Sequence, residues 1–214
     1  MGGPLFLVGM RRETRIVGAL APSVVGATGL AEAMNEPPGA IISFGICGSL
    51  DPALKVGDLV IGLSVNRVQT DIELTARLMA ALPHARLGAV AASDAMAADV
   101  AAKARLFAQT GARIVDMESH LAVRSGLPFA VLRAVSDTAD ANLPHAARVG
   151  LKPDGSPDIW AVLKSLARDP SQLPALIRAA RDVETAYKVL GNALDLFGPG
   201  IGSLDLGQHL VDVT

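Results

Sequence analysis

Hydrophobic positions along the chain form short apolar runs of strand length, separated by segments with helical spacing. The strand-like runs cover residues 5–9, 40–44, 56–61, 87–92, 112–117 and 129–136. Helical spacing marks residues 14–20, 71–82, 95–109 and a short stretch that ends near residue 123. This alternation predicts an α/β fold, with three α/β/α layers around a central mixed, mostly parallel sheet.

The last third of the chain has a different pattern. A connection rich in proline and glycine, residues 143–157, precedes two helical patterns at 158–168 and 173–196. In the first of these helices we expect Ile159, Trp160, Leu163 and Leu166 to face inward. The chain is predicted to form one catalytic domain over residues 1–200, with a helical C-terminal part at 142–198 and a loosely ordered tail at 201–214.

Composition narrows the class of protein. Half of the 214 residues are hydrophobic but only 3% are aromatic, so the core must be mostly aliphatic. A net charge of -2, from 19 basic and 21 acidic residues, argues against a nucleic-acid partner. The lone Cys47 cannot form an intrachain disulfide, and the cysteine and histidine spacing matches no metal site. No apolar run has the length of a signal peptide or a membrane span, so we expect a cytoplasmic protein with no transmembrane segment.

Three carboxylates follow predicted strands: Glu13, Glu118 and Asp137. In open α/β sheets ligands bind beyond the carboxyl ends of the strands, so acids at these positions suggest an active site. Simpler explanations exist for each. For Glu118 and Asp137 the alternative is a cap on the helix that follows, and for Glu13 it is an ion pair with nearby surface arginines.

Several segments carry a family resemblance, and their order along the chain is more specific than any one of them. They are residues 9–13 (GMRRE), 45–50 (GICGSL), 56–61 (VGDLVI), 115–118 (VDME) and 133–140 (RAVSDTAD). Together they resemble the nucleoside phosphorylase and nucleosidase superfamily, and most closely its methylthioadenosine/adenosylhomocysteine nucleosidase branch. The resemblance implies the fold of these enzymes, cleavage of a purine nucleoside at its N-glycosidic bond, a homodimer, and no cofactor other than phosphate as a possible co-substrate.

The resemblance also implies roles for individual residues. Asp137, with Ser136 beside it, would protonate or hydrogen-bond the departing purine, and Glu13 would orient and deprotonate the attacking water. The substrate-binding residues would be Met117 and Glu118 on the ribose and Gly48, Ala92 and Ser93 along the rest of the pocket. These roles make chemical sense because an acid near the base lowers the barrier to glycosidic cleavage. One carboxylate can also accept both hydroxyls of the ribose diol.

Two departures from the family pattern bear on the reaction and the substrate. Ile46 stands where a hydroxyl residue often helps to hold phosphate or water in the family, which weakens the case for phosphate. The alternative phosphate ligands are Ser49, Arg11, Arg12 and a backbone nest at residues 45–48. Glu13 favours hydrolysis. The segment between residues 61 and 87 is shorter than in the methylthioadenosine enzymes, which leaves room for a larger 5′ substituent. In this respect the chain resembles the hopanoid-associated members, whose implied substrate is the lipid-linked nucleoside adenosylhopane.

Other functions remain open from the sequence. The chain could be a phosphate-dependent purine nucleoside phosphorylase, a methylthioadenosine/adenosylhomocysteine nucleosidase, or a non-catalytic module that binds nucleosides through the same contacts. Cys47 is more simply a packing residue than a nucleophile. Trp160 is more simply a core residue than a lid over a lipid tail.

Overall fold

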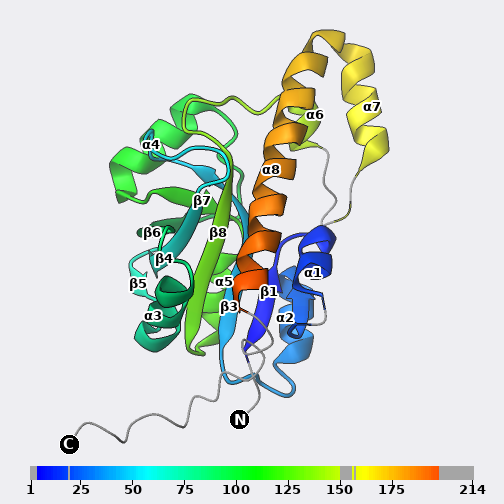
Figure 1. Cartoon of the computed structure of the whole chain (residues 1–214). Coiled ribbons are helices and arrows are strands. Elements are labelled where there is room, and N and C mark those ends of the chain that lie inside the picture. The colour runs from blue at the N-terminus through cyan, green and yellow to red at the C-terminus, as the bar shows by residue number, and fades with distance from the viewer. Residues whose placement is uncertain (1–3, 19, 150–155, 157, 198–214) are drawn as a thin grey trace, which may run out of the picture.

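The computed structural model describes residues 4–18, 20–149, 156 and 158–197, and its elements alternate along much of the chain (Figure 1). The strands are β1 (Leu5–Val8), β2 (Ser23–Val25), β3 (Ile41–Ser49), β4 (Leu59–Val65), β5 (Val68–Gln69), β6 (Arg86–Ala92), β7 (Ile114–Asp116) and β8 (Phe129–Asp137). The helices are α1 (Arg11–Val17), α2 (Gly26–Ala33), α3 (Ile72–Ala81), α4 (Val100–Thr110), α5 (Ser119–Ser125), α6 (His145–Arg148), α7 (Ile159–Arg168) and α8 (Leu173–Phe197), with a 3₁₀ turn at Pro170–Gln172.

All of these strands belong to one mixed sheet. Its order is β2-β1-β3-β7-β6-β4-β5, and β8 pairs with both β3 and β4, so the pairing closes into a ring through β3, β8, β4, β6 and β7. The pairs β1–β2, β1–β3, β3–β8, β4–β6 and β6–β7 are parallel, whereas β3–β7, β4–β5 and β4–β8 are antiparallel. The predicted α/β class with a mixed, mostly parallel sheet is therefore confirmed.

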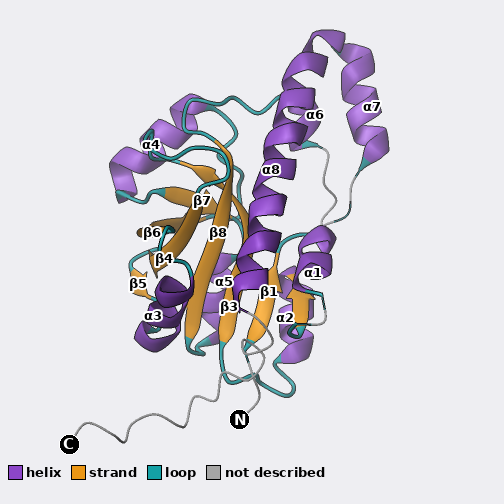
Figure 2. Cartoon of the chain, viewed as in Figure 1, coloured by secondary structure: helices purple, strands orange, loops and turns teal. Residues whose placement is uncertain are grey.

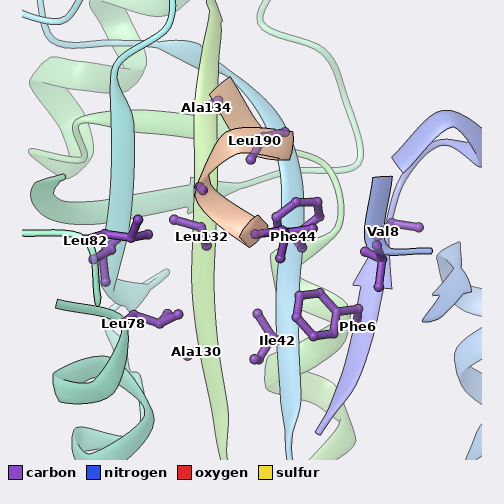
Figure 3. Packing of buried hydrophobic residues seen from close by; sticks show 14 of the residues in the cluster. Phe6, Val8, Ile42, Phe44, Leu78, Leu82, Ala130, Leu132, Ala134 and Leu190 are labelled. Carbon is purple, nitrogen blue, oxygen red and sulfur yellow. The ribbon is translucent and has the colours of Figure 1, made fainter. Parts of the chain in front are cut away.

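Helices cover both faces of this sheet (Figure 2). On one face the long helix α8 and the helix α3 pack against the strands, and Leu190 and Leu78 meet Phe44 and Leu132 in the larger apolar cluster (Figure 3). On the other face Leu30 of α2 and Ala122 of α5 join a second cluster built on the same strands. Since β3 and β8 are covered on both sides, they are apolar along most of their length, as buried parallel strands require.

The strand-like run predicted at 40–44 does not stop before the glycine-rich segment at residues 45–50. Strand β3 continues through it to Ser49, and Gly45 pairs with Arg133 while Gly48 pairs with Asp137 and Val115. The glycines are needed because other side chains cross β3 at close range, not because the chain turns there. This correction matters for function, because an extended strand does not form an anion-binding nest.

Other boundaries also differ from the sequence prediction. The helix expected from residue 95 begins at Val100, where the Asp99 carboxylate accepts the backbone N–H of Ala102 at 2.8 Å and caps the first turn. The chain between residues 20 and 40, for which no element was predicted, forms the short strand β2 and the helix α2. Their residues are mostly only partly buried, so the hydrophobic pattern there is weak.

The prediction that α7 turns Ile159, Trp160, Leu163 and Leu166 inward is wrong for the first three, whereas Leu166 is half-buried. Ile159 is 66% exposed, Trp160 82% and Leu163 50%, whereas the buried residue of this helix is Ser165. The tail predicted at 201–214 lies outside the described residues. In the part of the chain that the structure describes, no helix combines the length and the apolarity that crossing a membrane would require.

Candidate active site

Glu13 lies in the first turn of α1 and is almost fully buried, at 1% exposure. Its Oε2 accepts the backbone N–H groups of Gly9 and Met10, both at 2.9 Å, and its Oε1 accepts that of Ile46 at 3.0 Å. The carboxylate therefore ties the turn after β1 to strand β3. Burial raises the pKa of Glu13, while the nearby Arg133 and these N–H groups act in the opposite direction.

The surface ion-pair explanation for Glu13 is wrong. The neighbouring Arg12 instead pairs with Glu184 of α8, with Nη2–Oε distances of 2.8 and 2.6 Å. Because Glu13 points inward from the first part of α1, it faces the carboxyl ends of β1 and β3, where ligands of parallel sheets bind.

Arg133 is the cation at the centre of the acidic cluster, and it is fully buried in β8. Its Nε lies 2.8 Å from Asp116 Oδ2 and its Nη1 lies 3.5 Å from Glu118 Oε2. Its Nη2 donates to Ser43 Oγ at 2.7 Å. Nη1 is buried and has no hydrogen-bond acceptor among the described residues, so this N–H is available to a bound water or substrate oxygen.

Gly45 allows the carboxylate of Glu13 and the guanidinium of Arg133 to meet over β3. A Cβ atom at this position would lie 2.3 Å from Glu13 Oε1 and 2.7 Å from Arg133 Nη1. Gly45 also has a φ angle of +152°, which favours glycine. Two charged groups thus approach each other above a strand that offers no side chain to keep them apart.

Glu118 joins this cluster from the end of β7. Its carboxylate lies against the turn after β1, since a Cβ atom at Gly9 would be 2.3 Å from Glu118 Oε1. Burial raises the pKa of Glu118 to about 7; Arg133 opposes the shift, and Asp116 and Glu13 add to it. Glu118 occupies the N-cap position of α5, but its side chain makes no capping hydrogen bond, so capping does not explain the acid there.

Asp137 ends strand β8 and forms a second charged centre with Lys103 of α4. The Lys103 ammonium donates to Asp137 Oδ1, and also to the carbonyl oxygens of Thr138 at 2.7 Å and Ala141 at 3.2 Å. Lys103 is fully buried, and these three acceptors use all of its ammonium hydrogens. The pair is therefore a built feature of the fold and not an accidental surface contact.

The second carboxylate oxygen of Asp137, Oδ2, contacts no charged group among the hydrogen bonds of the described residues. Oδ2 accepts from Ser136 Oγ at 3.1 Å, and the same hydroxyl lies 3.1 Å from the Cys47 carbonyl oxygen. Gly48 lies under the carboxylate, since its Cβ atom would be 3.2 Å from Oδ1. Asp137 precedes no helix, so the capping explanation fails for it as well.

The remaining predicted pocket residues lie next to Glu118. Ala92 ends β6 beside Asp116, the Ser93 N–H donates to the Asp116 carbonyl oxygen at 3.0 Å, and Met117 is 39% exposed. The side-chain amide of Asn66 pairs with both backbone groups of Ala92, at 2.8 and 3.0 Å, which brings the β4–β5 turn to this edge.

Cys47 does not have the properties of a nucleophile. It is 4% exposed, and burial raises the pKa of its thiol well above the ordinary value, which disfavours the reactive thiolate. A surface hollow of about 740 Å³ lies at the start of β1, lined by residues such as Leu5, Pro22 and Pro37, and it includes none of the carboxylates described above.

The structure also brings in residues that sequence reasoning did not single out. They are Arg133, Asp116, Ser43, Ser119 and Lys103. A signal existed for two of them, because Arg133 and Asp116 are charged residues inside apolar strands, where an unpaired charge is costly. Lys103 had no such signal, since a lysine in an alanine-rich helix usually faces solvent.

Comparisons with known proteins agree with this architecture. The structure is similar to futalosine hydrolase of Helicobacter pylori strain 26695, at 17% identity and a TM-score of 0.58, covering 90% of this chain and 97% of that one. It is also similar to a mutant of the methylthioadenosine/adenosylhomocysteine nucleosidase of Helicobacter pylori with 5′-methylthioadenosine bound, at 18% identity and a TM-score of 0.60, covering 91% and 99%. The corresponding nucleosidase of Neisseria meningitidis gives 15% identity and a TM-score of 0.62, also covering 91% and 99%. At these identities the likeness shows the fold.

Family assignment rests on the sequence itself. No curated protein matches the chain. The family model of the phosphorylase superfamily, however, matches residues 18–168, which include two of the three carboxylates, Glu118 and Asp137. The superfamily expected from the sequence motifs is therefore confirmed, and the chain belongs to the phosphorylase superfamily.

Proposed function

We propose that the protein hydrolyses the N-glycosidic bond of a 5′-substituted adenosine and releases adenine. The observation that carries the proposal is the pairing of two different charged centres at one edge of the sheet. Glu13 and Arg133 meet over Gly45, and Glu118 lies near Arg133 and against Gly9. Asp137, paired with Lys103, lies beside Gly48, three residues further along the same strand. The centre with Glu13, Glu118 and Arg133 can bind the ribose and the attacking water, and the centre with Asp137 and Lys103 can bind the leaving base.

Asp137 is assigned to the purine. As the glycosidic bond breaks, electrons move into the base, and a positioned acid that donates a proton or hydrogen bond to it contributes about 10² to 10⁴ in rate. Its Oδ1 is engaged by Lys103, so Oδ2 with Ser136 is the part of the carboxyl group that remains for the base. The Lys103 ammonium holds the carboxyl group in place through Oδ1.

Glu118 is assigned to the ribose. With a pKa of about 7 it is largely ionised in weakly alkaline solution, where it accepts hydrogen bonds from both ribose hydroxyls. The neighbouring Arg133 Nη1 is a buried donor without a hydrogen-bond acceptor among the described residues, and it lies close to both Glu118 and the Gly45 site.

Glu13 is assigned to the attacking water. Its carboxylate has about four acceptor sites, of which backbone N–H groups occupy three, so one remains for a water molecule. The same contacts hold the carboxylate rigidly, which favours a fixed orientation of the water.

Several contacts support water as the nucleophile over phosphate. Ile46 offers no hydroxyl and its N–H is used by Glu13. The Ser49 hydroxyl donates to the Asp51 carbonyl oxygen at 2.8 Å, and Arg12 is engaged by Glu184. Because β3 is extended here, its backbone does not form an anion-binding nest.

For the 5′ substituent we propose a large apolar group, with adenosylhopane as the specific hypothesis. Between β4 and β6 the chain forms only the two-residue strand β5 and the helix α3. The exposed apolar side chains here are Val68 and Ile72, and Leu63 near the end of β4 is also exposed. The homodimer that the family resemblance implies stays a prediction, which light scattering tests.

An adenine-release assay tests the proposal. Methylthioadenosine, adenosylhomocysteine, adenosine, inosine and adenosylhopane are compared, each with and without phosphate. We expect release of free adenine without phosphate, fastest with adenosylhopane, and a decrease in kcat of about 10² to 10⁴ in Asp137→Asn with ligand binding retained. Dependence on phosphate would indicate a phosphorylase, and fastest turnover of methylthioadenosine would remove the large-substituent hypothesis. Binding without turnover of any nucleoside would indicate a non-catalytic module.

A further inference from the structure

The turn between β4 and β5 holds two residues in a left-handed backbone conformation that side chains disfavour. Asn66 has a φ angle of +48° and Arg67 has one of +73°. Two-residue hairpins take this form, and asparagine suits the first of the two positions, whereas the second is usually a glycine. Asn66 therefore has a local reason to occupy the turn, and any further role must be distinguished from it.

Asn66 also makes contacts that the hairpin does not require. Its backbone N–H donates to the Val90 carbonyl oxygen at 3.0 Å and continues the parallel pairing of β4 with β6. The side chain then extends this pairing by one step. Its Oδ1 accepts the Ala92 N–H at 3.0 Å, and its Nδ2 donates to the Ala92 carbonyl oxygen at 2.8 Å. Both backbone groups of the last residue of β6 are thus bound by the side chain of a turn residue 26 positions earlier.

The chain that follows Ala92 begins at the charged centre that contains Glu118. We call this chain, residues 93–98, the base segment. The Ser93 N–H donates to the carbonyl oxygen of Asp116, which lies two residues before Glu118. Because β6 lies between β7 and β4 in the sheet, the start of the base segment is held by β7 on one side and by the β4–β5 turn on the other.

The base segment ends at the other charged centre. The Leu143 N–H donates to the Ala98 carbonyl oxygen at 2.9 Å, and Asn142 Oδ1 accepts the Val100 N–H at 3.0 Å. Asn142 and Leu143 belong to the loop that follows Asp137. The base segment therefore runs from the centre assigned to the ribose to the centre assigned to the base, along the position that the purine would take.

We propose that Asn66 is a positioning residue for the purine and acts by fixing the base segment through Ala92. The inference rests on the proposed function, because it places the leaving base between the two charged centres. With the amide in place, the base segment is ordered before the nucleoside binds. Without it, only a fraction of the molecules hold the segment correctly, and the apparent affinity falls by that fraction. The bound substrate selects the correct position, so the bond-breaking step changes little.

Two substitutions of Asn66 remove the contact in different ways. Asn66→Gly keeps the positive φ angle and removes the amide. Asn66→Asp keeps the size of the side chain but places an oxygen against the Ala92 carbonyl oxygen. We expect both to raise the Kd of free adenine, measured by titration calorimetry, by about tenfold, as the loss of backbone hydrogen bonds predicts. The KM of the nucleoside should rise by a similar factor, while kcat stays within about threefold of the wild type.

Arg67→Gly is the matched control. It changes the same turn and relieves a positive φ angle, but it leaves the Asn66 amide intact. Arg67 is exposed, and its substitution should change neither the Kd of adenine nor KM. Amide hydrogen exchange at Ala92 is a readout that needs no reaction, and it should be faster in Asn66→Gly and unchanged in Arg67→Gly. Urea unfolding checks that each variant is folded under the assay conditions.

Three results would overturn the inference. They are equal adenine affinity in Asn66→Gly and the wild type, a fall in kcat with an unchanged KM, and a loss of affinity in Arg67→Gly as large as that in Asn66→Gly. The last would show that the shape of the turn matters and the amide does not. A wild-type protein that binds no adenine and releases none from any nucleoside would instead overturn the proposed function, and this inference with it.

Discussion

Glu118 is a carboxyl group whose burial has consequences for stability as well as for binding. Its pKa is about 7 in the folded protein against an ordinary value of 4.5, so the folded state retains a proton that the unfolded chain releases. The resulting stabilisation is fully present below pH 4.5 and is lost as the pH rises through 7. At pH 8 the folded protein must hold an ionised, largely buried carboxylate beside Asp116 and Glu13.

Glu118→Gln is therefore expected to stabilise the protein at pH 8, by up to about 3 kcal/mol, and to change stability little at pH 4. Urea unfolding at the two pH values measures this difference. The variant should also lose affinity for ribosides, because a glutamine cannot accept two hydroxyls as a carboxylate does. Glu32→Gln on the exposed side of α2 is the control and should show neither effect. A variant less stable than the wild type at pH 8 would mean that attraction to Arg133 outweighs desolvation.

At the scale of elements, the ion pair between Lys103 and Asp137 joins helix α4 to strand β8. Removing one partner leaves the other charge buried and unpaired, which costs about 3 to 5 kcal/mol. We expect Lys103→Met to lose about this much stability, and the double variant Lys103→Met/Asp137→Asn to lose less than the sum of the single changes. A double-mutant cycle by urea unfolding measures the coupling. Lys188→Met, an exposed lysine of α8, is the control.

The same variant separates an electrostatic role from a structural one. If Lys103 assists the departure of the purine by holding Asp137, Lys103→Met should lower kcat for the nucleoside more than it raises KM. It should also leave nearly unchanged the hydrolysis of a 4-nitrophenyl riboside, whose leaving group needs no proton. Equal losses with both substrates would limit Lys103 to holding α4 and the loop after β8 in place.

The strands and the long helix α8 could be predicted from the sequence because their apolar residues are buried against the rest of the fold, which gives a clear hydrophobic pattern. The runs at 129–136 and 173–196 correspond closely to β8 and α8. The glycine-rich segment was misread because the reason for its glycines is remote in sequence: Glu13 and Arg133 need the space above Gly45. Helix α7 was misread because apolar spacing specifies a face but not what covers it.

The carboxylates of the candidate site were named from the sequence, whereas the residues that contact them in the structure could not be. Glu13, Glu118 and Asp137 follow strands, and the position at which a strand ends is a local property of the sequence. Lys103 reaches Asp137 only because α4 packs beside the end of β8, and Arg133 meets Glu118 only because β7 and β8 both border β3. Such juxtapositions depend on topology, which spacing along the chain does not encode.

At the scale of the whole molecule, the C-terminal helix α8 is connected to the turn that carries Glu13. Tyr187 of α8 is 5% exposed, and its hydroxyl donates to Met10 Sδ at 3.2 Å. The Arg12 guanidinium lies 4.4 Å from the centre of the Tyr187 ring and also pairs with Glu184. Glu184 and Tyr187 of α8 thus support the first turn of α1, and the pair Arg12–Glu184 joins residues 172 positions apart. Helix α8 lies outside the segment that matches the family model.

This connection predicts that a change in α8 affects catalysis as well as stability. Tyr187→Ala removes a buried aromatic ring and is expected to cost about 3 to 5 kcal/mol. The cavity that the substitution leaves would lie beside Met10, whose backbone N–H donates to the Glu13 carboxylate. Because Glu13 would then be held less firmly, kcat for adenine release should fall while KM changes less. Tyr187→Phe keeps the ring and its contact with Arg12, so it should cost less than about 1 kcal/mol and retain activity. Urea unfolding and adenine release, measured on the same preparations below the unfolding transition, test both variants. A fully active Tyr187→Ala protein would show that α1 and the turn before it hold Glu13 without help from α8.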